Sequence, residues 1–265
     1  MKKTILLFLI SFLLLPLFAH EFWLDPERFY YKPGALITVK FKVGEDFAGE
    51  NWNGNRDRVQ SLRLYNGNGY TQMDPVVSTE KGAAVQFSVG EEGTAVLAFE
   101  STPAFIKLEA GKFNEYLKEE GLTSALEWRR QNHQLDSPGI EHYRRSVKTL
   151  LKIGNGKSST YSTPTSLPVD IVFHNNPFLH SGETRVQGTV FFKGNILANQ
   201  PLYLWHRYKN KYIRSIQYTN AKGFFNFRIK SYGKWMISTV VMDRALPNSG
   251  ADWDSYWGSC TWGYY

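Results

Sequence analysis

Apolar residues open the chain in one long run, which then gives way to short alternating segments. The segment Ile5–Phe18 has almost no polar residues and follows Lys2 and Lys3. A positive start, an apolar run of this length and a small residue, Ala19, at its end are typical of a secretory signal peptide. The run is shorter than the ~20 residues that a membrane-spanning helix needs. We therefore expect residues 1–19 to be removed on export, so that the processed chain begins with His20.

Beyond this segment, the hydrophobic pattern predicts short β-strands separated by turns. In the first half of the chain the predicted strands are 22–24, 29–31, 36–43, 59–65, 83–89 and 94–101. In the second half they are 169–173, 183–192, 201–208, 212–218, 224–229 and 234–242, followed by an aromatic tail at 256–265. Gly, Pro, Asn and Asp punctuate these runs, as expected of turns. Strands at this spacing predict a sandwich or a barrel-like sheet.

Between the two sets of strands, the apolar spacing changes to that of helices. Phe113, Tyr116 and Leu117 predict a first helix from residue 110 to Gly121, and a second is expected at 124–133. A third amphipathic helix is predicted from Pro138, because apolar residues recur at 140, 143, 147, 150 and 151. Residues 157–168, rich in Ser, Thr and Pro, are interpreted as an interdomain linker.

These elements predict a mainly β protein of two domains. The first, at 20–165, is a β-rich domain with a helical insert at about 110–153. The second, at 166–265, is an Ig-like or transthyretin-like β-sandwich. The processed chain is long enough for one large β domain or two ordinary ones.

Composition and charge narrow the classes of function. Without Lys2 and Lys3 the formal charge falls from +7 to +5, because 29 basic side chains then face 24 acidic ones. The basic residues are scattered, which argues against a nucleic-acid interface. Cys260 is the only cysteine, so no intramolecular disulfide is possible, and a periplasmic location fits. The chain lacks a nucleophile elbow, a phosphate loop and a dinucleotide fingerprint, so we expect a non-enzymatic protein without an organic cofactor.

The processed amino terminus is the first candidate for metal binding. A free α-amine and the imidazole of His20 together chelate a borderline divalent metal such as Ni, Co, Cu or Zn. An α-amine has a pKa of roughly 7.7–8.0, so part of it is deprotonated at neutral pH. The terminal copper and nickel motif needs His at the third position, where this chain has Phe22. Further ligands must therefore come from elsewhere, and the alternative is that His20 simply starts a strand.

The remaining candidate ligands give weaker signals. His206 follows Trp205 in a predicted strand, and a histidine on such a face is more often a hydrogen-bonded core residue than a ligand. Glu45, Asp46 and Glu50 offer carboxylate oxygens, but their spacing does not match a calcium loop. Seven tryptophans offer stacking surfaces for sugars or packing for cores: Trp52, Trp128, Trp205, Trp235, Trp253, Trp257 and Trp262.

Several motifs together resemble one known family. They are AHEFWL at 19–24, VGEDFAGE at 43–50, EHYRRSVKTLL at 141–151, FKGNILANQP at 192–201 and DWDSYWGSCTWGY at 252–264. They are similar to a bacterial exported family of unknown function formerly labelled NikM-like. The resemblance implies a β-rich domain with a helical insert and then a carboxypeptidase-regulatory or transthyretin-like sandwich. It also implies a periplasmic role near nickel or cobalt uptake, with His20 and His206 as metal positions. Many relatives have a histidine before the methionine of the late strand, whereas this chain has Val241 before Met242.

The leading hypothesis is therefore a non-enzymatic periplasmic protein that binds a divalent transition metal and supports its uptake by a membrane transporter. The alternative is a scaffold protein of the cell envelope, whose β-sandwich binds a glycan or another partner. A hydrolase is a third and more distant possibility.

Overall fold

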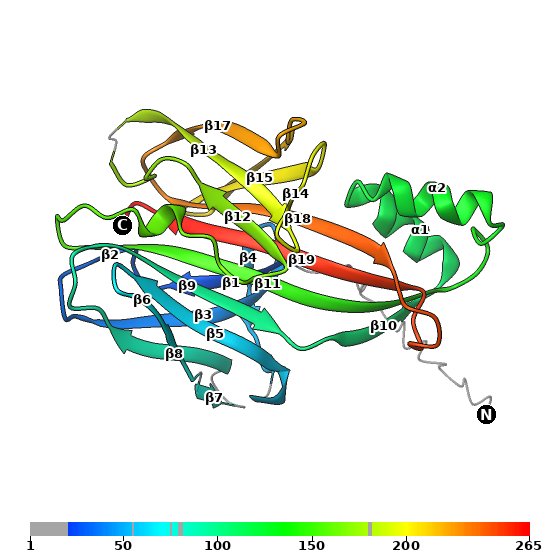
Figure 1. Ribbon diagram of the computed structural model, residues 1–265, viewed down its shortest axis with the longest axis horizontal. Helices are drawn as coiled ribbons and strands as arrows, with labels where there is room; N and C mark the ends of the chain where they lie inside the picture. Colours follow the sequence, from blue (N-terminus) through cyan, green and yellow to red (C-terminus); the bar gives the residue numbers. More distant parts are fainter. Residues whose placement is uncertain (1–20, 55, 75, 79–81, 180–181) are drawn as a thin grey trace, which may run out of the picture.

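The computed structural model describes residues 21–54, 56–74, 76–78, 82–179 and 182–265 of the chain. The predicted signal peptide and His20 lie outside these residues. The described part is mainly β, with two α-helices beside three sheets, which confirms the predicted fold class (Figure 1). It contains no helix that is long and apolar enough to cross a membrane.

The largest sheet has ten strands within the described residues. Its main path runs through β16 (Lys211–Tyr218), β15 (Pro201–Tyr208), β18 (Lys234–Arg244), β19 (Trp253–Gly263), β11 (Gly139–Ile153), β9 (Gly93–Ser101), β5 (Val59–Asn66) and β6 (Gly69–Gln72). Two further strands, β2 (Tyr30–Tyr31) and β10 (Ala104–Leu108), pair with β11. The long strands β11, β18 and β19 run through the middle of the molecule (Figure 1).

Two smaller sheets lie on opposite sides of these long strands (Figure 1). One contains β1 (Glu21–Pro26), β3 (Leu36–Glu45), β4 (Ala48–Asn51), β7 (Val76–Ser78) and β8 (Gly82–Ser88). The other contains β12 (Val169–Phe173), β13 (Glu183–Phe192), β14 (Asn195–Ile196) and β17 (Phe224–Lys230). Both bury apolar side chains in a shared core, so the architecture is that of a sandwich.

Strand β1 is held against the largest sheet through side chains rather than through a backbone ladder. The hydroxyl of Ser259 donates to the carbonyl of Phe22 over 2.7 Å, and that of Thr261 donates to the carbonyl of Leu24 over 2.8 Å. The other edge of β1 pairs antiparallel with β3. The beginning of the described chain is therefore fixed between two sheets.

The parallel pairing of β11 with β19 joins distant parts of the chain. It runs from Glu141 opposite Trp253 to Thr149 opposite Thr261. The largest sheet thus takes strands from both predicted domains, 20–165 and 166–265. The boundary between those domains stays a prediction, while the sheet itself is continuous across it.

Two of the three predicted helices are confirmed, and the third prediction is wrong. Helices α1 (Ala110–Glu119) and α2 (Thr123–Gln131) form at the predicted places. Residues 139–153, predicted as the end of the helical insert, are instead the strand β11. Every residue from Ser146 to Ile153 is buried, because both faces of this strand are covered. A continuously buried strand does not alternate, so its apolar spacing can be mistaken for that of a helix.

The tryptophans named above lie mostly in the interior, as expected of large aromatic side chains. Trp205, Trp235, Trp253, Trp257 and Trp262 are all buried. Trp52 and Trp128 are partly buried and pack against the cores. The described tryptophans therefore give no open platform for stacking sugars.

Candidate metal-binding pocket

A pocket of about 360 Å³ opens where β1 begins. Its lining residues come from five separate segments, and we call it the acid pocket: Glu21, Glu45, Asp46, Glu119, Glu120, Trp205 and Arg214. Five of these seven side chains are carboxylates and one is a guanidinium. The lining therefore has an excess of negative charge in a protein whose overall charge is positive.

Glu21 forms the inner wall of the acid pocket. Its side chain is buried, and its Oε1 accepts a hydrogen bond of 3.0 Å from the hydroxyl of Ser238. That hydroxyl in turn accepts a hydrogen bond of 2.9 Å from the indole N–H of Trp205. Burial raises the pKa of Glu21, against the opposing effects of Ser238 and of the charges on Arg145 and Arg214. The hydrogen bond from Ser238 thus orients the carboxyl group, while the cost of burying its negative charge is only partly compensated.

Glu120 lies across the pocket at the C-terminal end of α1. Burial, and then the charge of Glu21, raises its pKa to about 8, while Arg214 opposes the shift. Its Oε2 is buried and accepts no hydrogen bond from the described residues. At neutral pH this carboxyl group therefore holds a proton for most of the time.

The single cation of the lining, Arg214, is held by aromatic rings rather than by one carboxylate. Its guanidinium carbon lies 4.0 Å from the ring centre of Tyr203 and 4.9 Å from that of Trp205. Glu119 and the β3–β4 turn, with Glu45 and Asp46, are exposed at the mouth of the pocket. The mouth therefore presents charge to solvent, whereas Glu21 at the inner wall is buried.

The turn that carries Glu45 and Asp46 is fixed by its next residue. Asp46 and Phe47 both have a φ of 53°, a left-handed conformation that costs energy for side chains other than glycine. Phe47 is buried, and its ring centre lies 5.4 Å from that of Trp23. Arg207 Nη1 also donates to the Phe47 carbonyl over 3.3 Å. This packing holds the two acidic side chains at the mouth.

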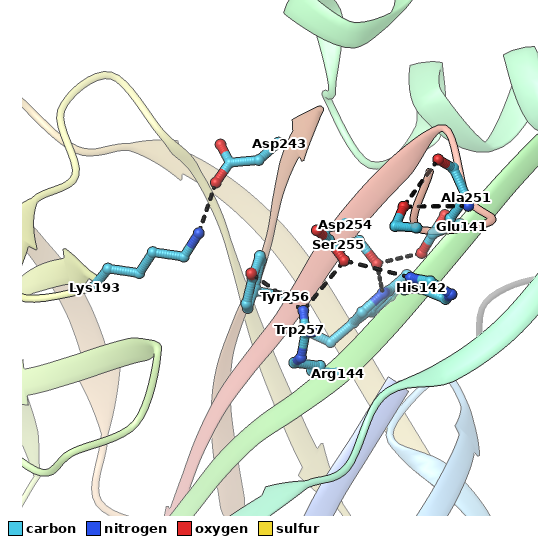
Figure 2. A network of polar contacts seen from close by, with 11 residues as sticks. Glu141, His142, Arg144, Lys193, Asp243, Ala251, Asp254, Ser255, Tyr256 and Trp257 are labelled. Atoms are coloured by element: carbon cyan, nitrogen blue, oxygen red, sulfur yellow. Dashed lines mark hydrogen bonds and ion pairs between the residues drawn. The ribbon is translucent and has the colours of Figure 1, made fainter. Parts of the chain in front are cut away.

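A second buried polar network lies along β11 and β19 (Figure 2). Glu141 is 2% exposed and accepts a short hydrogen bond from the hydroxyl of Ser255, which itself accepts from the indole N–H of Trp257 over 3.2 Å. Burial raises the pKa of Glu141 to about 7. The positive charge of Arg145 opposes the rise in pKa of both Glu141 and Glu21. The two carboxyl groups therefore share this guanidinium as an electrostatic partner.

Further ion pairs lie nearer the surface (Figure 2). Arg144 Nη1 of β11 lies 3.3 Å from Asp254 Oδ1 of β19, and the ammonium of Lys193, in the turn after β13, lies 2.9 Å from Asp243 of β18. These charges are compensated by direct partners. They differ in this respect from Glu120, whose inner oxygen lacks one among the described residues.

His206, one of the two predicted ligands, lies in β15 next to Trp205 but on its other face, since successive strand residues point to opposite sides. It is 7% exposed and stacks on Trp235 with ring centres 4.0 Å apart. Its Nε2 donates to the Tyr232 carbonyl over 3.1 Å. Burial lowers the pKa of its imidazole. The structure does not bring His206 to the acid pocket, and its role as a ligand stays a prediction.

His20, the other predicted ligand, lies outside the described residues and precedes Glu21 by one peptide bond. Within the described ranges, no three His, Cys, Asp or Glu side chains form a group that could hold a metal ion. The carboxylates of the acid pocket thus supply oxygen donors without forming a complete ligand cage by themselves. Such a pocket fits a metal only if a further donor joins it.

The sequence indicated Glu45 and Asp46 as possible oxygen ligands. It did not indicate that Glu21, Glu120 and Arg214 line the same pocket. These three side chains belong to a first strand, the end of a helix and an edge strand. Spacing along the chain gives no sign that they meet. The one available signal was the polar residue Glu21 directly before the apolar run Phe22–Leu24 of β1.

The fold and the pocket define a β-sandwich protein with a buried carboxylate site. The sequence matches a family model described as "Domain of unknown function (DUF4198)" over residues 17–243. The chain belongs to this family. No curated protein matches the sequence.

Similarity to solved structures is weak. A DUF4785 family protein from Legionella pneumophila matches 81% of this chain and 50% of its own, with 10% identity and a TM-score of 0.25. Escherichia coli alpha-2-macroglobulin matches 92% of this chain with 8% identity and a TM-score of 0.23. A DUF3823 family protein from Bacteroides uniformis matches 89% of this chain and 96% of its own, with 9% identity and a TM-score of 0.21. The chain spans half the length of the first of these proteins and 20% of the second. Similarity at this level carries no argument about function.

Proposed function

We propose that this is an exported, non-enzymatic protein of the periplasm that binds a divalent transition metal, nickel or cobalt, at the acid pocket and supports its uptake. The observation that carries the proposal is the position of Glu21. This residue follows His20 directly, and its carboxyl group forms the inner wall of the acid pocket. After cleavage at Ala19, the chelating terminus would begin one residue from that wall.

The donor chemistry supports this assignment. The terminal amine and imidazole of His20 supply two nitrogen donors, and Glu21 and Glu120 supply carboxylate oxygens. Mixed nitrogen and oxygen sets suit borderline divalent metals such as Ni, Co, Cu and Zn. The excess of carboxylates at the mouth also favours the approach of a cation over that of an anion.

The raised pKa of Glu120, to about 8, gives the pocket a proton to exchange. A divalent cation compensates the charges of Glu21 and Glu120 better than a single proton does, so binding should release that proton. Affinity should therefore rise with pH through the neutral range. This dependence also provides for release of the ion where the pH is lower.

Calorimetric titration with Ni, Co, Cu and Zn tests the proposal, using protein processed to a native His20 terminus. The comparison is the same protein with one extra residue before His20, which removes the terminal amine from the chelate. We expect the extra residue to weaken binding by at least about tenfold, or about 1.4 kcal/mol. Unchanged affinity would refute the terminal chelate.

Two carboxylate variants locate the site within the chain. Glu120→Gln should weaken binding and lower the number of protons released per ion by about one, measured by titration in buffers of different ionisation enthalpy. Asp243→Asn removes a carboxylate outside the acid pocket and should leave affinity unchanged. Equal effects of the two variants would argue for nonspecific binding to surface charge. His206→Gln in the same titration tests the predicted role of His206.

The membrane transporter stays a proposed partner, supported by the family resemblance alone. The alternative is a scaffold that binds glycans. It is less well supported, because most of the tryptophans are buried and cannot stack on a sugar. Intrinsic fluorescence quenching by sugars would nevertheless separate the two functions, since an interior tryptophan should not respond to them.

A further inference from the structure

Strand β16 is an open edge of the largest sheet. It pairs with β15 on one side, and no other strand of the described chain pairs with its second side. Seven of its eight residues are exposed, although the strand is rich in apolar side chains. Tyr212, Ile213, Ile216 and Tyr218 are 48%, 64%, 51% and 59% exposed. An unpaired edge of eight residues is a template for pairing with another strand.

The pairing with β15 determines which backbone groups of β16 face outward. Tyr218 lies opposite Pro201, which has no N–H and cannot exchange two hydrogen bonds with its partner. Antiparallel pairs alternate between hydrogen-bonded and non-hydrogen-bonded, and the register is continuous. The outward N–H and C=O groups therefore belong to Tyr212, Arg214, Ile216 and Tyr218.

Natural edge strands usually carry features that prevent pairing, such as charged side chains, especially lysine, prolines, bulges or short length. The sequence of β16, KYIRSIQY, has two basic residues, Lys211 and Arg214, but no proline, and its pairing with β15 shows no bulge. At the opposite end of the same sheet, β6 has only four residues. The edge formed by β16 is thus the less protected of the two.

We propose that β16 pairs antiparallel with β16 of a second copy of this chain, with the two-fold axis at Ser215. In this register Tyr212 lies opposite Tyr218 of the other copy, and Arg214 lies opposite Ile216. All four outward-facing residues then form hydrogen-bonded pairs. The contact is isologous, so it closes as a dimer and does not propagate.

The two neighbouring symmetric registers are less favourable. With the axis at Arg214, two guanidinium groups lie directly opposite each other, and like charges in that position are destabilising. With the axis at Ile216, Tyr212 has no partner residue within β16. The register centred on Ser215 opposes no like charges and adds two tyrosine pairs, each of which contributes to stability. This complementarity of the strand with itself identifies the partner as a second copy.

The dimer goes beyond the proposed metal function and does not depend on it. Arg214, beside the two-fold axis, also lines the acid pocket. Dimerisation would therefore place one acid pocket on each side of the axis, joined by a continuous sheet. Metal titration and dimerisation can be measured separately, so the failure of one would not be mistaken for the failure of the other.

Engineered cysteines test the register. In Ser215→Cys, the two thiols lie opposite each other in a non-hydrogen-bonded pair, where Cα atoms are about 4.5 Å apart and a disulfide can form. In the control Ile213→Cys, the two thiols are four positions apart along the strands and cannot meet. Native Cys260 is buried and does not interfere. We expect mild oxidation to cross-link Ser215→Cys into dimers and to leave Ile213→Cys monomeric on a non-reducing gel. Equal cross-linking would overturn the register.

A proline substitution tests the edge itself. Because the N–H of Ile216 faces away from β15, Ile216→Pro removes a donor of the dimer but no hydrogen bond within the monomer. Ile216→Thr keeps the N–H and serves as the control. In sedimentation velocity over a range of concentrations, wild type and Ile216→Thr should dimerise, and Ile216→Pro should remain a monomer. Circular dichroism should show that Ile216→Pro is folded. A wild type that stays monomeric at every concentration, or a dimer that persists in Ile216→Pro, would overturn the proposal.

Discussion

A buried ion pair joins β11 of the largest sheet to β12 of the four-stranded sheet. Lys148 Nζ lies 2.6 Å from Asp170 Oδ1, and the two side chains are 2% and 4% exposed. The other oxygen of Asp170 accepts a hydrogen bond of 2.5 Å from the backbone N–H of Thr165. Replacing Asp170 with asparagine keeps the shape of the side chain and removes its charge. The Lys148 ammonium then remains buried without a counter-charge.

Removing one partner of a buried ion pair costs about 3–5 kcal/mol, because the remaining charge is desolvated and uncompensated. This is a large part of the roughly 5–15 kcal/mol by which a protein is usually stable.

Urea unfolding of wild type and Asp170→Asn, followed by circular dichroism at neutral pH, measures this loss of stability. The matched control is Asp243→Asn, since Asp243 and Lys193 are 45% and 49% exposed and pair over 2.9 Å. Breaking an exposed pair should cost at most about 1 kcal/mol. Similar small losses of stability in both variants would refute the prediction.

Three further predictions concern the pocket and the core. The folded-state pKa of Glu120 is raised from 4.5 to about 8, so its stabilising contribution is complete below pH 4.5 and is lost as pH rises through about 8. Over that interval the unfolding free energy of wild type should fall more than that of Glu120→Gln, by on the order of 4 kcal/mol, and parallel urea profiles would contradict this. Ser238→Ala leaves Glu21 Oε1 without its donor and the indole of Trp205 without its acceptor, which should cost about 1–3 kcal/mol in thermal or urea unfolding. Ser238→Thr, which keeps the hydroxyl, should lose less stability. Equal losses of stability in the two variants would argue against a stabilising role of the hydroxyl. Burial raises the pKa of Cys260 to about 12, so a thiol reagent should label it only in denaturant, and rapid labelling of the native protein would contradict its burial.

The sequence predicted most of the strands because half-buried strands alternate visibly. In β3, for example, Ile37, Val39 and Phe41 are buried and the residues between them are not. The prediction failed at β11, where burial on both faces removes the alternation. Lys148, within the segment predicted as a helix, is buried in β11, and its charge is compensated by Asp170 from the neighbouring sheet. Only the tertiary structure supplies that partner.

The candidate site was harder to predict than the fold. Its acidic turn at Glu45 and Asp46 was noticed, but the inner wall depends on which segments meet. Glu21 and Glu120 are 99 positions apart in the chain, and Arg214 is farther still from Glu21. Contacts between such distant residues leave no periodicity or motif in a single sequence. The raised pKa values arise from that burial and could not be predicted before the contacts were known.

The central place of β19 has a consequence for the order in which the protein is made. It is the last strand of the largest sheet in sequence order, yet it fits between β18 and β11 in the middle of that sheet. A chain in which β19 has not yet been synthesised therefore exposes two long strand edges and cannot complete its core. Because pairing between such distant segments is slow, the folded state should form only after β19 has been made. A variant with β19 truncated should therefore aggregate.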